Sequence, residues 1–267
     1  SYMDKFFKYE KERWEAPRLE YAILDADDSN FVDEYTLTYA QQSAMDPTGD
    51  EREAFVAEMS AVLQANNGLD VYKKDSFHGK LVLFDFRSHL YAPLICLEKS
   101  NLKIQLSPVA LNTDEMRFVD YLKAYVDNHA AELVDKSLYL LRNKSKVGMG
   151  FFEAGNFYPD YILWIDTPET QYISFIDPKG LMHIRPDDPK IEFYKTIKDL
   201  ETRLSPTADG KRIVLNSFIM AGTRSSDLRM WWSTPEVDAD RAYREARNVY
   251  TLDNDECVES MMRKILQ

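Results

Sequence analysis

Two short apolar runs joined by a polar turn limit the folds open to this chain more than any other feature. The first run is YPDYILWI at residues 158–165, and the second is QYISFID at residues 171–177. Both are rich in β-branched and aromatic residues, and DTPET separates them, so they predict two β-strands joined as a hairpin. Both runs also carry carboxylates, which are costly to bury in apolar surroundings unless a cation or hydrogen bonds compensate them.

Four ionisable side chains lie in or beside these runs: Glu153, Asp160, Asp177 and Lys179. Residues two apart in a strand share a face, so Asp177 and Lys179 project together. Asp160 opens the first strand. We expect the hairpin to set Asp160 and Asp177 at opposite ends, so that a bulge, a twist or diverging strands would be needed to bring them together.

These side chains are suited to one kind of chemistry. Two carboxylates and a main-chain carbonyl are ligands for a hard cation such as Mg2+, which polarises a phosphoryl oxygen and lowers the pKa of a bound water. A neighbouring lysine orients that water or stabilises the charge that develops on the phosphate. Asp160, Asp177 and Lys179 therefore predict a phosphodiester hydrolase site. The alternative for Asp177 and Lys179 is a strand-end turn with a local ion pair.

The acid-x-lysine pattern alone is weak evidence, because it occurs three times in the chain. The three triplets are DPK at 177–179, DPK at 188–190 and DGK at 209–211. Only the first follows an apolar strand. The other two lie in polar turn segments, where a structural role is the better interpretation.

The rest of the chain predicts an α/β fold in which a mixed sheet is flanked by helices. Helical periodicity and capping residues predict helices, and short apolar runs between turn signals predict strands. The predicted helices are at 50–68, 111–133, 190–204 and 237–248, with a strand and then a helix over 249–266. Further strands are predicted at 80–86, 89–98, 137–143, 147–154 and 212–221.

Three stretches of this sequence resemble the C-terminal nuclease domain of the DNA-cleaving subunit of type III restriction enzymes. They are KSLYLLRNKSKVGMGFFEAGNFYPDYILWI, QYISFIDPKGLMHI and DPKIEFYKTIKDLE, with SHLYAPLI and LSPVALNTDEMRFVDYL upstream. The resemblance covers roughly residues 78–225 and implies the restriction-endonuclease-like core of PD-(D/E)xK nucleases. It gives Asp160 and Asp177 as metal ligands and Lys179 as the catalytic lysine. For a further acid it leaves Glu153, which we favour, or Glu115.

The resemblance also implies partners. It predicts a Mg2+-dependent, site-specific deoxyribonuclease that acts on double-stranded DNA within a restriction-modification system. A helicase motor belongs to the same subunit, and a methyltransferase subunit reads the sequence, yet this chain has no G-x-x-x-x-G-K-[ST] motif. An alternative is a catalytically silent docking module for the motor or the methyltransferase. Candidate phosphate contacts are Lys190, His183, Arg142, Lys144 and Lys146.

Composition adds limits on domains and location. The net charge of −12 argues against nucleic acid as a general partner, apart from local basic clusters such as LLRNKSKVG. We expect a mostly helical N-terminal extension over 1–75 and the nuclease domain over 76–267. Without a signal peptide or a long apolar run, we expect a cytoplasmic protein with Cys96 and Cys257 as free buried thiols. Because it begins at Ser1, we expect a processed chain or part of a longer one.

Overall fold

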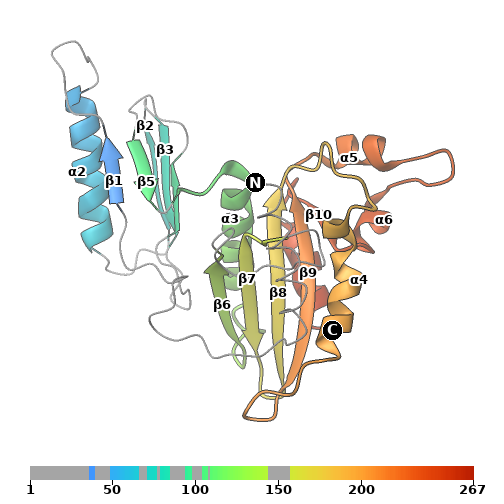
Figure 1. Cartoon of the computed structure of the whole chain (residues 1–267). Helices are drawn as coiled ribbons and strands as arrows, with labels where there is room; N and C mark the ends of the chain where they lie inside the picture. Colours follow the sequence, from blue (N-terminus) through green and yellow to red (C-terminus); the bar gives the residue numbers. More distant parts are fainter. Residues whose placement is uncertain are drawn as a thin grey trace, which may run out of the picture.

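A mixed sheet of five strands forms the centre of the C-terminal half of the protein (Figure 1). The computed structural model describes residues 36–39, 49–65, 71–76, 79–84, 94–97, 104–107, 109–143 and 157–267. The strand order is β10-β9-β8-β7-β6. The strands are β6 (Ser137–Arg142), β7 (Tyr161–Asp166), β8 (Thr170–Lys179), β9 (Arg212–Ala221) and β10 (Val249–Thr251).

The connections explain why the sheet is mixed. β6, β7 and β8 run antiparallel, and the tight turn between β7 and β8 is closed by Thr167, whose N–H and hydroxyl donate to the Thr170 carbonyl, both at 2.9 Å. β9 and β10 continue parallel to β8, because helices provide the long crossovers that parallel strands need. The crossover helices are α4 (Pro189–Glu201), α5 (Ser225–Trp232) and α6 (Arg241–Glu245).

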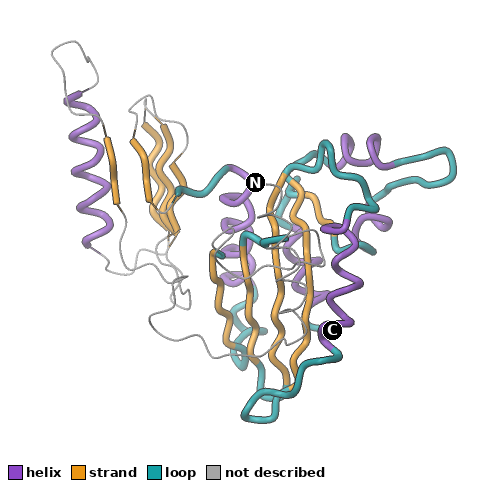
Figure 2. Tube along the Cα trace, viewed as in Figure 1, coloured by secondary structure: helices purple, strands orange, loops and turns teal. Residues whose placement is uncertain are grey.

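The sheet has two buried faces, because its side chains alternate between two cores. Figure 2 shows the helices that lie around the sheet. On β7, Tyr161 and Leu163 pack in one core with α3 (Thr113–Asn128) and α7 (Glu256–Ile265). Ile162, between them, packs in the other core with α4 and α5. This period of two is what a strand buried on both faces requires, and the sandwich of helices around a mixed sheet confirms the predicted α/β architecture.

The predicted strands and helices of this region are found with small differences. The run at 147–154, predicted as a strand, lies outside the described residues. The helix predicted over 237–248 is shorter, since α6 spans only Arg241–Glu245 after its cap Asp240. Both cysteines are buried thiols, as expected. None of the helices in the described ranges combines the length and apolar character that crossing a membrane requires.

The N-terminal part contributes one helix and five short strands among its described residues. The helix predicted from residue 50 is α2, and the boundary expected after residue 75 lies within β2, which pairs with β3. Strand β4 joins the core under α3, where Leu94 and Cys96 are almost fully buried. The elements are β1 (Thr36–Tyr39), α2 (Gly49–Ala65), β2 (Val71–Ser76), β3 (Gly79–Phe84), β4 (Leu94–Leu97) and β5 (Ile104–Ser107).

Helix α3 begins at a complete capping box. The Asn112 side chain accepts from the N–H groups of Asp114 and Glu115, and the Glu115 carboxylate accepts in return from the Asn112 N–H at 2.7 Å. These reciprocal bonds satisfy N–H groups that a helix start otherwise leaves unpaired. They also hold Glu115 at a fixed place at the end of the sheet.

We expect Asn112→Ala to lower the free energy of unfolding by about 1 kcal/mol, the usual cost of losing a cap. Urea unfolding followed by circular dichroism measures this loss. The matched control is Arg117→Ala on the same helix, whose ion pair with Asp114 is long at 3.8 Å and partly exposed. The control should change stability by less than about 0.5 kcal/mol, and an equal loss in both variants would contradict a specific role for the cap.

Candidate active site

The register of β7 against β8 places Asp160 and Asp177 side by side. The last paired residues at this end of the hairpin are Tyr161 and Ile176, so one further step sets Asp160 opposite Asp177. The expectation that the hairpin would hold them at opposite ends is therefore wrong. In an antiparallel pair the beginning of one strand faces the end of the other, and neither a bulge nor divergence is needed.

The two carboxylates interact strongly. Asp177 is only 5% exposed, and Asp160 is half-buried beside it. Burial, followed by the charge of Asp177 and a hydrogen bond with it, raises the pKa of Asp160 to about 8. At neutral pH the pair therefore holds a proton, because burial and the neighbouring carboxylate disfavour the charged form of Asp160.

Lys179 lies beside the pair on the same face of β8. Its ammonium group forms an ion pair with the Asp177 carboxylate and lies 5.3 Å from the centre of the Phe157 ring. Phe157 is itself fixed against Phe193 of α4, with ring centres 5.8 Å apart. The predicted shared face of Asp177 and Lys179 is confirmed, and so is the local ion pair named as the alternative. The two observations are compatible, since an ammonium group beside a carboxylate also serves a hydrolase site.

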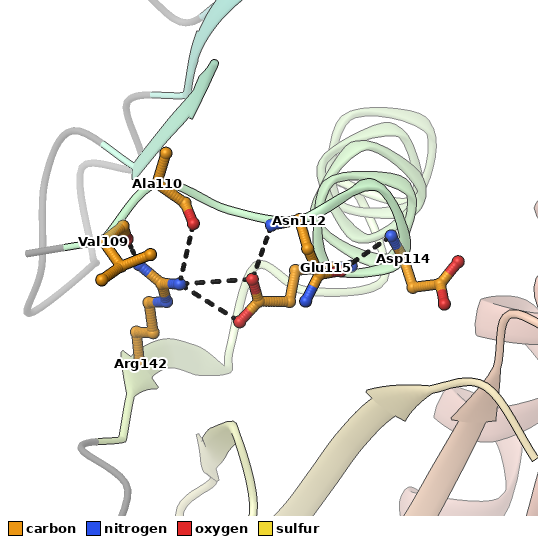
Figure 3. A network of polar contacts seen from close by, with 6 residues as sticks. All are labelled: Val109, Ala110, Asn112, Asp114, Glu115 and Arg142. Atoms are coloured by element: carbon orange, nitrogen blue, oxygen red, sulfur yellow. Dashed lines mark hydrogen bonds and ion pairs between the residues drawn. The ribbon is translucent and has the colours of Figure 1, made fainter. Parts of the chain in front are cut away.

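A third acid, Glu115, reaches the same end of the sheet from α3 (Figure 3). It is 5% exposed, and its negative charge contributes to raising the pKa of Asp160. Of the two acids left open by the sequence, Glu115 is thus near the pair, whereas Glu153 lies outside the described residues.

Arg142 holds Glu115 rather than pointing to solvent (Figure 3). One of its terminal nitrogens lies 3.2 Å from both Glu115 carboxylate oxygens and donates to the Ala110 carbonyl at 3.3 Å, while the other donates to the Val109 carbonyl. Its side chain is 15% exposed. The predicted phosphate contact at Arg142 therefore has a second, observed role, which is to fix the acid at the start of α3.

The other four candidate phosphate contacts are Lys144, Lys146, His183 and Lys190. Lys144 and Lys146 lie outside the described residues. His183 is exposed, with its ring edge-on to Trp231 at 6.4 Å. Lys190 is the second residue of α4, and its backbone N–H donates to the Asp188 carboxylate at 2.9 Å. The structure thus brings Asp160, Asp177, Lys179 and Glu115 together.

Sequence reasoning missed two residues that fix the end of β8. The Gly222 N–H donates to the Lys179 carbonyl at 3.0 Å, and the Thr223 hydroxyl accepts from the Leu181 N–H at 2.7 Å. A Cβ atom at Gly222 would lie 2.0 Å from the Asp114 carboxylate, so the glycine allows the start of α3 to approach β9. The only signal in the sequence is the small-residue run AGT directly after an apolar strand.

The donor set fits a hard cation in its chemistry but not as a complete cage. Carboxylate oxygens are the ligands that Mg2+ prefers, and it commonly keeps several waters with only one or two protein carboxylates. Among the described residues, no three His, Cys, Asp or Glu side chains are grouped as a metal site. Two carboxylates that share a proton are nonetheless a place where a cation would relieve repulsion.

Comparison with protein-family models, with curated proteins and with solved structures found no match for this chain.

We expect the Asp160→Asn variant to change how stability depends on pH. An aspartate in the unfolded chain has a pKa of about 3.9, and that of folded Asp160 is raised to about 8. Between these values the folded protein holds a proton that the unfolded chain has released, so wild-type stability falls as pH rises and levels off above pH 8. Asparagine mimics the protonated acid and removes this contribution.

Urea unfolding from about pH 5 to about pH 9, without divalent metal, measures the effect. The stability of Asp160→Asn relative to wild type should rise with pH by an amount on the order of 1 kcal/mol per unit, and then reach a plateau. A difference that stays constant over the whole range would show that the Asp160 proton is not held in the folded state.

Proposed function

We propose that the sheet domain is a Mg2+-dependent endonuclease of the PD-(D/E)xK type that hydrolyses phosphodiester bonds in DNA. The observation that carries this proposal is the meeting of Asp160 and Asp177 at one end of the sheet with Lys179 beside them. Its place in a type III restriction-modification system, with a helicase motor and a methyltransferase as partners, rests on the sequence resemblance alone and stays a prediction.

The charges of the site explain why a divalent cation suits it. Three acids, Asp160, Asp177 and Glu115, interact there. Lys179 pairs with Asp177, and Arg142 pairs with Glu115. The remaining negative charge is the one that Asp160 neutralises by holding a proton. A cation bound by Asp160 and Asp177 would replace that proton.

Mg2+ held by these two carboxylates would polarise a phosphoryl oxygen of the substrate and lower the pKa of a bound water. The side chains of the chain itself have separate tasks. Asp160 gives up its proton when the cation arrives. Lys179, held against Phe157, places a positive charge where the negative charge of the phosphate builds up. Glu115 and Arg142 are positioning residues that keep the start of α3 against the site.

We expect Lys179→Met to reduce cleavage by roughly 100-fold or more while preserving the fold, the usual cost of removing one preorganised donor. Nicking of supercoiled plasmid DNA with Mg2+ or Mn2+ provides the assay. The matched control is Lys211→Met, because Lys211 belongs to another acid-x-lysine triplet and pairs with Asp166 at 2.6 Å, at the far end of β7. Cleavage by Lys179→Met at the wild-type rate would refute the proposed role.

The second candidate function is a docking module that has kept the nuclease fold without its chemistry. Two observations favour it: Lys179 already neutralises Asp177, and the described residues include no complete group of three metal-ligating side chains. Such a module has no reason to bind a divalent cation. Wild-type protein that neither binds Mn2+ nor nicks DNA would support the docking module over the nuclease.

A further inference from the structure

A small pocket opens at the carboxyl ends of the parallel strands β9 and β10. Tyr250 and Thr251 at the end of β10 line it, together with Ser225 at the start of α5, which follows β9. The carboxyl ends of parallel strands are the usual place for ligands in open α/β sheets. Arg244, Glu245 and Asp253 also line it.

Arg244 is the unusual member of this lining. It is only 3% exposed, yet within the described part of the chain no carboxylate forms an ion pair with it. Its two hydrogen bonds go to neutral groups, the Ala239 carbonyl at 2.7 Å and the Ser225 hydroxyl. A buried charge without an opposite charge costs several kcal/mol, so such a guanidinium calls for an anion.

The acids around the pocket do not meet this need. Asp253 accepts from the Ser225 N–H at 3.1 Å, and Glu245 accepts from Arg241 at 2.6 Å, so both are engaged with other donors. Burial lowers the pKa of Arg244 from its ordinary value, even though Asp253, Asp240 and Glu245 attract its charge from a distance. These acids therefore offset only part of the free-energy cost of burying the charged guanidinium of Arg244.

We propose that this pocket binds a phosphate group. Its volume is about 120 Å³, and a single water needs about 10–15 Å³ of such space, so a tetrahedral oxyanion fits. The two hydrogen bonds of Arg244 fix its planar fork, and a guanidinium with donors left over recognises phosphate oxygens well. Ser225, Tyr250 and Thr251, which carry hydroxyl groups, also line the pocket.

Two sources offer this chemistry: a backbone phosphate of DNA, or a small phosphate compound free in solution. The proposal does not depend on nuclease activity, since it rests on Arg244 and its pocket. Phosphate binding can thus be measured without metal, and it should be unchanged in the variant Asp160→Asn/Asp177→Asn.

Calorimetric titration of inorganic phosphate, at an ionic strength matched with sodium chloride, tests the proposal. We expect binding to wild-type protein, at least a tenfold loss in Arg244→Gln, and a severalfold loss in Ser225→Ala. Arg229→Gln is the matched control, because Arg229 is an exposed arginine of α5 that pairs with Asp238. Its affinity for phosphate should equal that of wild type.

A second measurement keeps the test valid if Arg244→Gln fails to fold. In wild-type protein labelled with 15N, the Nε–Hε resonance of Arg244 should shift during the phosphate titration. No phosphate binding above the chloride control, or binding that leaves this resonance and the affinity of Ser225→Ala unchanged, would overturn the proposal. A short DNA duplex that competes with phosphate would identify the backbone as the source, and a duplex that does not compete would identify a free phosphate compound.

Discussion

The antiparallel register of β7 against β8 is the constraint on which the candidate site depends. It sets Asp160 opposite Asp177, and the period of two then brings Lys179 to the same face. A shift of one residue would turn Asp177 and Lys179 toward the opposite face of the sheet. The apolar residues of the hairpin prevent such a shift, because Tyr161 and Ile162 are buried in different cores on either side. The packing of the sheet therefore fixes the chemistry at its edge.

The same edge gathers charge from several elements. Acids come from the ends of β7 and β8 and from the start of α3, and the basic partners Lys179 and Arg142 neutralise two of them. The third negative charge is avoided by proton uptake at Asp160. The clustered acids therefore favour the binding of a cation, although they do not form a complete set of metal ligands. The site is compatible with a net charge of −12 for the whole chain, because only the few charges near Asp160 and Asp177 determine whether a cation binds there.

Much of the fold followed from the sequence, because strands and helices here have clear periods and caps. The cap at Asn112 and the acids of the first turn predicted the start of α3, and the apolar run ending at Asp177 predicted β8. The site was harder to predict, since spatial neighbours depend on register and packing. The sequence-based expectation misjudged the ends of the hairpin. It left the further acid open between Glu153, which it favoured, and Glu115, because no pattern within one strand shows which helix starts beside it. Glu115 lies near the pair, and Glu153 lies outside the described residues. The buried guanidinium of Arg244 was invisible for the same reason: its environment comes from α5, α6 and β10 together.

We infer that Asp160 and Asp177 form one site in which a proton takes the place of a cation. The most direct test is calorimetric titration of Mn2+ at pH 7 in two buffers with different heats of ionisation, which counts the protons released on binding. We expect Mn2+ to bind to wild-type protein with release of close to one proton, this release to decline above pH 8, and binding to be lost in Asp160→Asn/Asp177→Asn. Binding of equal strength in both proteins, or binding to wild type without proton release at pH 7, would contradict this inference.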